Sequence, residues 1–363
     1  MKIALVHDWL IHMRGGEKVL DAIAELYPDA VIYTLFYDRK KLSPRLRERK
    51  IRASFLQYFP GIRYYYRWLL PILPLAIRSL RIEEADLVIS SSHCVAKGIR
   101  VPAKARHFCY CHTPMRYLWG FQDVYFSRYL FPVRWVIGAV LHWLKQWDLK
   151  TNEAVDQFIA NSEFIRARIK SVYGRDAVVV NPPADTEFFR PEGVREKYYL
   201  AVSHFVPYKR LDVVIEAFNG LDRKLVVIGS GPLEAQYARL RKSGQIFFWG
   251  SVSDAELRKA YAGAQALIFP AEEDFGIVPL EAQACGTPVI AFRKGGALET
   301  VKSGVFFDDQ TAGSAREAVH RFESQTFDPA EVSGRVQRFG RAGFLENMKR
   351  AVADALAQGA VSK

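Results

Sequence analysis

The strongest constraint on the fold is a regular alternation of short apolar segments with longer amphipathic ones. The short segments are typical of buried strands, and the amphipathic segments between them are typical of helices. The expected strands are Lys2–His7, Val31–Leu35, Leu87–Ser91, Arg106–Cys111, Gln157–Ala160, Val178–Val180, Tyr198–Ser203, Lys224–Ile228, Ile246–Trp249, Leu267–Phe269 and Pro288–Phe292. Strands that alternate with helices predict parallel sheets covered by helices, which is the α/β class.

The length of 363 residues fits two domains better than one, because a single hydrophobic core rarely grows that large. We expect a first Rossmann-like domain over 1–180 and a proline-containing linker over 181–197. A second such domain follows over 198–343. The tail 344–363 has apolar residues at helical spacing. The expected helices are Glu17–Leu26, Glu163–Tyr173, Leu211–Phe218, Leu233–Arg241 and Phe344–Ala357.

The net charge of +12 lies in the first half of the chain. Residues 1–180 hold 28 Lys and Arg against 16 Asp and Glu, and the rest of the chain holds 23 of each. Segment 39–81 carries twelve basic residues and one acid, Glu48, beside many aromatic and aliphatic side chains. This composition suits a surface that docks on anionic lipid headgroups. A solvated basic face over ordinary core helices is the alternative interpretation.

Other features limit the possible compartments and partners. No apolar stretch approaches the roughly 20 residues that a membrane-spanning helix needs, and the chain begins directly with a strand, so we expect no signal peptide. Four cysteines without a CxxC pair indicate reduced thiols of a cytosolic protein. Basic and aromatic residues also occur in nucleic-acid-binding proteins, but no recognised binding module accompanies them, so no nucleic-acid partner is expected.

The run from Phe269 to Ala282 carries the clearest chemistry. It places two carboxylates, Glu273 and Glu281, eight positions apart across an expected strand, loop and helix. Gly276 lets the backbone approach a ligand, and the amides of Phe275, Gly276 and Ile277 can donate hydrogen bonds at the helix N-terminus. Glu273 is expected in the loop and Glu281 one to two turns into the helix. A plain helix start with acidic residues is the alternative.

This run resembles the E-x7-E signature of retaining glycosyltransferases of family 4, which have the GT-B fold. The resemblance continues without a gap to Ala291 and ends in Gly295-Gly296-Ala297-Leu298-Glu299-Thr300-Val301. It implies two Rossmann-like domains whose parallel sheets face each other across a cleft, and a terminal helix that packs back on the first domain. It also implies that Glu273 holds the donor sugar and Glu281 the ribose hydroxyls.

In the first half, the resemblance points to His112 and to the pair Gly15 and Gly16. The segment Tyr110–Tyr117 is similar to that of mannosyltransferase-like members, in which a histidine lies beside the donor sugar. The paired glycines follow the first strand, where a helix N-terminus can bind phosphate. A structural histidine and a plain turn are the alternatives. His93, at a similar strand end, is a possible site residue.

In the second half, Lys209 matches the family lysine that compensates charge on the leaving diphosphate. The family arginine is replaced by His204, so either His204 or Arg210 is expected to supply the second cation, or the phosphate site is weaker than usual. The loops that carry Gly231 and Val252 are expected to line the nucleotide site, although both are compatible with ordinary turns.

The resemblance as a whole is closest to bacterial enzymes that use GDP-mannose. It implies a retaining hexosyl transfer onto a sugar carried by a polyprenyl-diphosphate lipid, in polysaccharide or O-antigen assembly. No DxD-type metal motif lies in a convincing place, so we expect no metal and no cofactor beyond the nucleotide-sugar substrate. The basic aromatic segment 39–81 leads us to expect a peripheral position on the inner face of the cell membrane. A UDP-sugar donor, or a non-catalytic binding protein on the same fold, are the alternatives.

Overall fold

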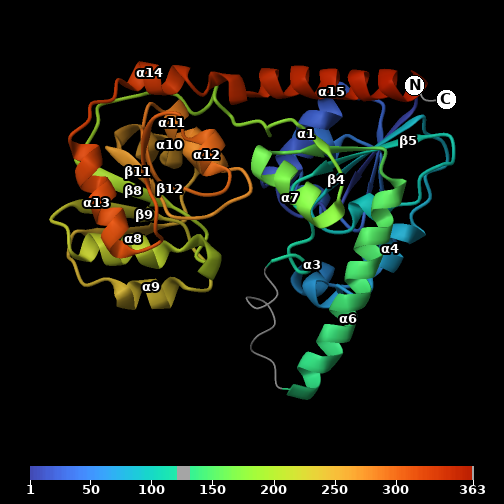
Figure 1. The fold of residues 1–363 in the computed structure, drawn as a ribbon, viewed down its shortest axis with the longest axis horizontal. Helices are drawn as coiled ribbons and strands as arrows, with labels where there is room; N and C mark the ends of the chain where they lie inside the picture. The colour runs from blue at the N-terminus through green and yellow to red at the C-terminus, as the bar shows by residue number, and fades with distance from the viewer. Residues whose placement is uncertain (121–130, 362–363) are drawn as a thin grey trace. The chain divides into compact units, whose positions relative to one another are not determined.

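The computed structural model describes residues 1–120 and 131–361, and the chain divides into two compact units (Figure 1). Unit 1 comprises residues 1–183 together with 344–363, and unit 2 comprises residues 184–343. Each unit contains one parallel sheet covered by helices, so the expected pair of Rossmann-like domains is confirmed.

The described part of unit 1 has a seven-stranded parallel sheet in the order β3-β2-β1-β4-β5-β6-β7. Its strands are β1 Ile3–His7, β2 Val31–Thr34, β3 Ile51–Ala53, β4 Leu87–Ser92, β5 Arg106–Cys111, β6 Gln157–Ala160 and β7 Ala177–Val179. Strands β1 and β4 pair in a register that sets Val6 beside Ser90 and His7 beside Ser91. The sheet order reverses between these two strands, and ligands of such sheets bind outside the carboxyl ends at that point.

The helices of unit 1 include several short ones that connect β2 to β4. Its α-helices are α1 Gly15–Leu26, α2 Pro44–Arg47, α3 Ile62–Tyr65, α4 Leu73–Ser79, α6 Phe131–Lys150, α7 Glu163–Tyr173 and most of α15 Arg341–Val361. Its 3-10 helices are η1 Arg39–Lys41, η2 Phe55–Tyr58, η3 Tyr66–Leu69, η4 Ala96–Gly98 and η5 Thr151–Ala154.

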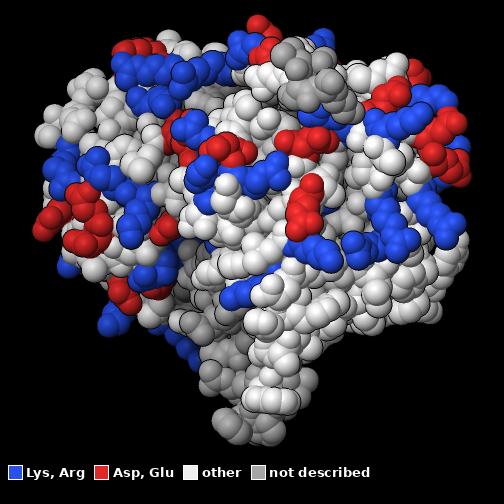
Figure 2. Space-filling model, turned by 45° about the vertical axis from the view of Figure 1, so that its right-hand side comes forward, with Lys and Arg blue, Asp and Glu red and all other residues white. Residues whose placement is uncertain are grey.

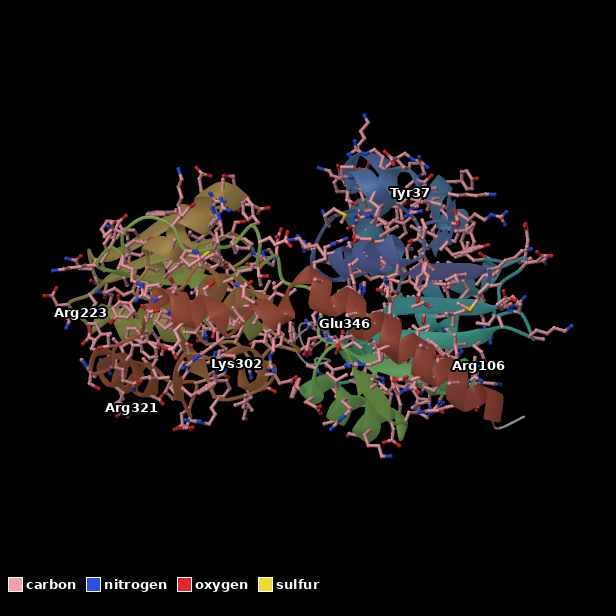
Figure 3. All side chains as sticks on the ribbon, turned by 90° about the horizontal axis from the view of Figure 1, so that it is seen from above. Tyr37, Arg106, Arg223, Lys302, Arg321 and Glu346 are labelled. Atoms are coloured by element: carbon pink, nitrogen blue, oxygen red, sulfur yellow. The ribbon has the colours of Figure 1, made fainter. Side chains whose placement is uncertain are left out.

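The C-terminal helix α15 belongs to the core of unit 1. Figure 3 shows it lying over this unit, with Glu346 on its length. Phe344 and Met348 are buried in one apolar cluster with Leu5 of β1 and Leu20 of α1, whereas Glu346 is exposed. Buried apolar side chains on one face of the helix hold it in place, because each contributes roughly 1.5–3 kcal/mol when removed from water.

The described part of unit 2 has a six-stranded parallel sheet in the order β10-β9-β8-β11-β12-β13. Its strands are β8 Tyr198–Val202, β9 Lys224–Ile228, β10 Ile246–Gly250, β11 Ala266–Phe269, β12 Val289–Phe292 and β13 Gly304–Phe307. Its helices are η6 Pro207–Lys209, α8 Leu211–Asn219, α9 Glu234–Leu240, α10 Asp254–Gly263, α11 Ile277–Ala284, α12 Ala297–Thr300, α13 Ala312–Glu323, α14 Pro329–Gly334 and η7 Gln337–Phe339. The sheet order reverses between β8 and β11.

Two strands were missed by the sequence analysis, which ended the second sheet at residue 292. β3 has three residues and β13 has four, and each forms one outer edge of its sheet. Such short edge strands carry little apolar periodicity of their own. Residues 184–197 lie in unit 2, where Phe189 is buried and the Ala184 amide donates to the Phe339 carbonyl at 2.9 Å.

Candidate active site

The reversal point of unit 2 brings together two loops that are far apart in the sequence. One loop follows β8 and carries Lys209, and the other follows β11 and carries Glu273. Their side chains form an ion pair, and each keeps only about a fifth of its surface exposed (18% and 22%). A partly buried cation at a strand end can neutralise the negative charge of a diphosphate. The structure thus brings together two of the residues that the sequence analysis assigned to catalysis.

Phe275 and Gly276, between Glu273 and α11, offer a ligand backbone groups and no side chain. Gly276 has φ of +99°, a conformation that favours glycine, and it precedes the first residue of α11. The Phe275 ring is buried against Phe339, with ring centroids 6.1 Å apart. Of the three residues predicted to contact the ligand here, Phe275 and Gly276 can therefore do so only through their main-chain amides. These amides lie at the positive end of α11, which begins at Ile277.

Two further glycines hold this loop in place. The Gly296 amide donates to the Glu273 carbonyl at 2.7 Å. A Cβ atom at Gly296 would lie 2.1 Å from the Phe275 carbonyl oxygen, and one at Gly295 would lie 2.5 Å from that of Glu273. The Gly295-Gly296 pair is therefore needed so that the two backbones can approach each other closely.

Glu281 lies in the second turn of α11, as the spacing predicted, and it is 9% exposed. Its Oε2 accepts a hydrogen bond from the Tyr261 hydroxyl at 3.2 Å. Burial, together with the charge of Glu281, raises the pKa of Tyr261 well above its usual value, so this hydroxyl stays protonated and donates. Tyr261 therefore fixes the carboxylate that is expected to bind the ribose.

The two candidates for a second cation differ in what they contact. Arg210 has a positive φ of 51° and ends the loop after β8. Its guanidinium forms an ion pair with Asp212 at 3.2 Å and donates to Gln310 Oε1 at 3.3 Å. His204 is exposed in the same loop. Arg210 is thus engaged with protein groups, and His204 is accessible to a ligand.

Gly231 and Val252 lie on neighbouring strand-end loops at the same edge of the sheet. Gly231 follows β9 with φ of +157°, and a Cβ atom there would lie 2.8 Å from the backbone N and O of Phe205 in the loop after β8. Val252 follows β10 and is partly buried against the core of unit 2. The loops after β8, β9, β10 and β11 therefore share one edge.

In unit 1, the reversal point gathers three histidines. His7 ends β1, His93 follows β4 and His112 follows β5. The His112 ring centroid lies 6.3 Å from that of His7 and 6.2 Å from that of His93. A Cβ atom at Gly16 would lie 3.6 Å from His112 Nε2, which places the first turn of α1 beside this histidine. The expected residues Gly16 and His112 are therefore adjacent, and Gly15 begins the same helix.

Both His7 and His112 are uncharged near neutral pH. Burial lowers the pKa of His7 to about 3 and lowers the pKa of His112 well below its usual value, because a charged imidazole loses its hydration. Ser91 Oγ lies 3.1 Å from His7 Nδ1 and 2.8 Å from His112 Nε2. One hydroxyl therefore connects the two rings.

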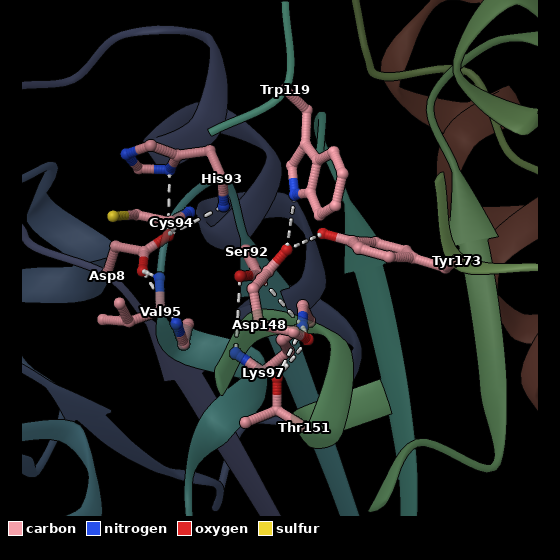
Figure 4. A network of polar contacts seen from close by, with 11 residues as sticks. Asp8, Ser92, His93, Cys94, Val95, Lys97, Trp119, Asp148, Thr151 and Tyr173 are labelled. Atoms are coloured by element: carbon pink, nitrogen blue, oxygen red, sulfur yellow. Dashed lines mark hydrogen bonds and ion pairs between the residues drawn. The ribbon is translucent and has the colours of Figure 1, made fainter. Parts of the chain in front are cut away.

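Asp8, the residue after β1, ties β1 to the loop after β4. Its buried carboxylate accepts from the amides of His93, Cys94, Val95 and Ala96 at 2.6–2.9 Å, and lies 3.1 Å from His93 Nδ1 (Figure 4). Hydrogen bonds to a charged carboxylate are stronger than those between neutral groups, so several of them hold the donating amides in place. It fixes the loop that carries His93 at the edge of the histidine cluster.

A buried ion pair joins η4 to α6. Lys97 Nζ is 2.9 Å from Asp148 Oδ1, and both side chains are almost fully buried. Asp148 Oδ2 also accepts from Trp119 Nε1 at 2.8 Å and from the Tyr173 hydroxyl at 2.9 Å (Figure 4). This network joins η4, α6 and α7 to the segment that follows β5.

Several residues of these two groups were not predicted from the sequence. They are His7, Asp8, Ser91, Tyr261 and Gln310. His7 and Asp8 end the first expected strand, so their position next to a sheet edge was a usable signal. Tyr261 and Gln310 lie in the helix before β11 and the loop after β13, and their role depends on tertiary contacts that no local pattern encodes.

Within residues 1–120 and 131–361, no cluster of three or more His, Cys, Asp or Glu side chains is arranged to hold a metal ion. In the same part of the chain, no helix combines the length and apolar character that crossing a bilayer requires.

Two Rossmann-like units with candidate ligand loops at their reversal points define a protein of the GT-B class. The model of Glycosyltransferase Family 4 matches residues 13–188, and the model of Glycosyl transferases group 1 matches residues 185–341. The two matches follow each other along the chain with little overlap. The chain belongs to the family 4 glycosyltransferases.

Curated relatives match over part of their length. The chain is 33% identical over 174 residues to the GDP-mannose-dependent alpha-(1-6)-phosphatidylinositol monomannoside mannosyltransferase of Mycolicibacterium smegmatis, covering 39% of this chain and 46% of the relative. It is 27% identical over 219 residues to the D-inositol 3-phosphate glycosyltransferase of Segniliparus rotundus, covering 52% and 47%. The chain thus spans about half the length of these relatives.

Solved structures share the fold over nearly the whole chain. Anabaena HepE in complex with UDP and glucose aligns with a TM-score of 0.69 at 18% identity, covering 97% of this chain and 99% of that one. The sucrose-phosphate synthase of Thermosynechococcus elongatus aligns with a TM-score of 0.73 at 18% identity, covering 99% and 100%. At this identity the likeness establishes the GT-B fold alone.

Proposed function

We propose that this protein transfers a hexose from a nucleoside-diphosphate sugar to a sugar acceptor with retention of the anomeric configuration. The observation that carries the proposal is the grouping of Lys209, Glu273 and Glu281 at the reversal point of unit 2, within a chain of this family. In this proposal Lys209 compensates phosphate charge, Glu273 holds the donor sugar and Glu281 holds the ribose.

In the proposed reaction, the bond between the anomeric carbon and the β-phosphate oxygen breaks while a bond to the acceptor hydroxyl forms on the same face. In this proposal the acceptor proton passes to the leaving phosphate oxygen, which serves as the base. Lys209 and the amides at the start of α11 stabilise the charge that develops on the diphosphate. Since these groups belong to the protein, the proposal includes no metal ion and no cofactor.

GDP-mannose is the donor that we propose. The relative from Mycolicibacterium smegmatis, whose name includes GDP-mannose, supports this choice. The segment around His112, which is half-buried beside α1, also resembles mannosyltransferase-like members. In this proposal His112 contacts the donor sugar, and the amides of Gly15 and Gly16 face its phosphates.

The proposed acceptor is a saccharide carried on a polyprenyl-diphosphate lipid at the inner face of the cell membrane. Segment 39–81 supports this part of the proposal. Its strongly exposed aromatic side chains are Tyr58, Tyr64 and Trp68, at 85%, 78% and 72%. Tyrosine and tryptophan favour the headgroup region because one end of each side chain is apolar and the other polar.

The charge around these aromatic side chains also suits anionic lipids. Residues 54–82 contain four arginines and no carboxylate. Figure 2 shows one face of the molecule, on which several lysine and arginine side chains lie above a largely white lower region. A surface hollow of about 650 Å³ is lined in part by Arg39, Lys40, Tyr58 and Arg63 of this segment and by Asp38, which forms an ion pair with Arg63 at 3.1 Å. It offers cations to a phosphate-bearing headgroup.

A transfer assay with labelled sugar tests the proposal. We expect wild-type protein to move label from GDP-mannose to a polyprenyl-diphosphate-linked acceptor. Lys209→Met should reduce turnover by about 10²-fold or more, because one preorganised charge contact commonly contributes that much. The matched control is Lys242→Met, which removes an exposed lysine of the same unit. Absence of transfer and of donor hydrolysis with GDP- and UDP-sugars alike would refute an enzymatic role.

A further inference from the structure

Ser91 occupies an unusual position between two imidazoles. It lies on β4 opposite His7 of β1, and its Oγ is within hydrogen-bond distance of His7 Nδ1 (3.1 Å) and His112 Nε2 (2.8 Å). Ser91 and His7 are both buried (1% and 0% exposed). In the described part of the chain, these two nitrogens are the hydrogen-bond partners of the Ser91 hydroxyl.

The hydroxyl has one proton, and this limits how the rings can be protonated. A neutral imidazole carries one N–H and one lone pair. If Ser91 donates to one ring, the other ring must donate to Ser91. The outer nitrogens, His7 Nε2 and His112 Nδ1, then have opposite character: one is a donor and the other is an acceptor.

The surroundings of His7 decide between these two arrangements. His7 Nε2 is buried, and among the residues that the structure describes it has no hydrogen-bond partner. The Cε1 atom next to it lies 3.5 Å from the Cβ position at Gly16, in the first turn of α1. The positive end of a helix favours a lone pair over an N–H. A buried N–H without an acceptor also costs more free energy than a buried lone pair without a donor. His7 therefore carries its proton on Nδ1 and donates to Ser91.

We propose that His7 and Ser91 are positioning residues that fix His112 as the Nδ1–H tautomer, so that His112 donates a hydrogen bond to the ligand. Ser91 donates to His112 Nε2, and the single proton of His112 is left on Nδ1. The proposal rests on the proposed function for the identity of the ligand: the oxygen that accepts from His112 is then a hydroxyl oxygen of the donor sugar.

The chain supplies a matched control one residue away. Ser90 is equally buried on the same strand, and its Oγ lies 2.9 Å from Nε2 of another buried histidine, His107. His107 Nδ1 lies 3.0 Å from the Ala154 carbonyl, away from the candidate site. Ser90→Ala and Ser91→Ala thus remove the same atom from the same kind of pair, but only Ser91 contacts His112.

The test measures the tautomer directly, by nitrogen-15 NMR of the wild-type protein labelled in its histidine rings. His112→Gln identifies the His112 signals by their loss. We expect His112 to show a protonated Nδ1 and an unprotonated Nε2. Ser91→Ala should change this pattern, whereas Ser90→Ala should leave it unchanged and Ser91→Thr, which keeps a hydroxyl, should restore it. A protonated Nε2 on His112 in the wild type would overturn the proposal.

Kinetics give a second, independent measurement. We expect Ser91→Ala to lower kcat about 10-fold, the effect of losing one hydrogen bond to the ligand, with a small change in KM for the acceptor. Equal kcat values for Ser91→Ala and Ser90→Ala would contradict the proposal. If the wild type transfers no sugar at all, the proposed function fails, while the NMR result still decides the tautomer.

Discussion

Buried histidines make the stability of unit 1 depend on pH. Burial lowers the pKa of His7 to about 3 and that of His107 to about 4, and His112 is lowered for the same reason. In the unfolded chain each histidine titrates near pH 6.5. Below that pH the unfolded chain binds more protons than the folded protein, so the free energy of unfolding falls as the pH falls.

The size of the effect follows from the pKa values. Each pH unit below about 6.5 costs roughly 1.4 kcal/mol per histidine until the folded-state pKa is reached. At pH 5 this amounts to about 2 kcal/mol for His107 and about the same for His7. Because domains are stable by only about 5–15 kcal/mol, the loss is readily measured.

Urea unfolding, followed by tryptophan fluorescence, measures this loss of stability in the intact protein. Six of the seven tryptophans precede residue 184, so the signal reports mainly on unit 1. In His107→Gln the loss between pH 6.5 and 5 should be about 2 kcal/mol smaller than in the wild type. His142→Gln, which alters an exposed histidine of the same unit, is the control and should leave the loss unchanged. An unchanged loss in His107→Gln would refute the reasoning.

Three further results are expected. Lys97→Met should lower the free energy of unfolding by about 3–5 kcal/mol, because it leaves the buried Asp148 without its cation; an effect below 1 kcal/mol in the same urea assay would contradict this. Gly296→Ala should abolish donor binding in calorimetry, because the new Cβ would displace the Phe275 carbonyl. Gly313→Ala is the control and should bind the donor normally, because no described atom lies within 4 Å of the Cβ position at Gly313. Added chelator should leave the rate of sugar transfer unchanged, and a loss of activity that Mg²⁺ or Mn²⁺ restores would show a metal requirement.

Local patterns predicted most of the sheet. The bounds of β5, β6, β9 and α7 agree with those expected from the sequence, because each has a clear apolar run or a strong cap. Ser162 at the start of α7 accepts from the Ile165 amide at 3.0 Å, which fixes where the helix begins. The short edge strands β3 and β13 lack such signals.

Single candidate residues could be predicted from the sequence, but the contacts between them could not. Glu281 was placed correctly because an eight-residue spacing across a loop and helix start determines its turn. Two sets of contacts could not be predicted: the Lys209–Glu273 ion pair and the His7–Ser91–His112 chain. Each joins residues that are more than 20 positions apart in the sequence, at neighbouring strands. Strand order determines these contacts, and strand order is not a local property.

Donor binding by calorimetry tests the central claim most directly. The titrants are GDP, GDP-mannose, UDP and UDP-glucose, with wild type, Glu281→Ala and the exposed-site control Glu317→Ala. The account predicts that wild type and Glu317→Ala bind the GDP forms selectively, and that Glu281→Ala binds them at least 10-fold more weakly because a charged hydrogen bond to ribose is lost. Selective binding of the UDP forms would overturn the proposed donor. Failure to bind any of the four would contradict the account itself.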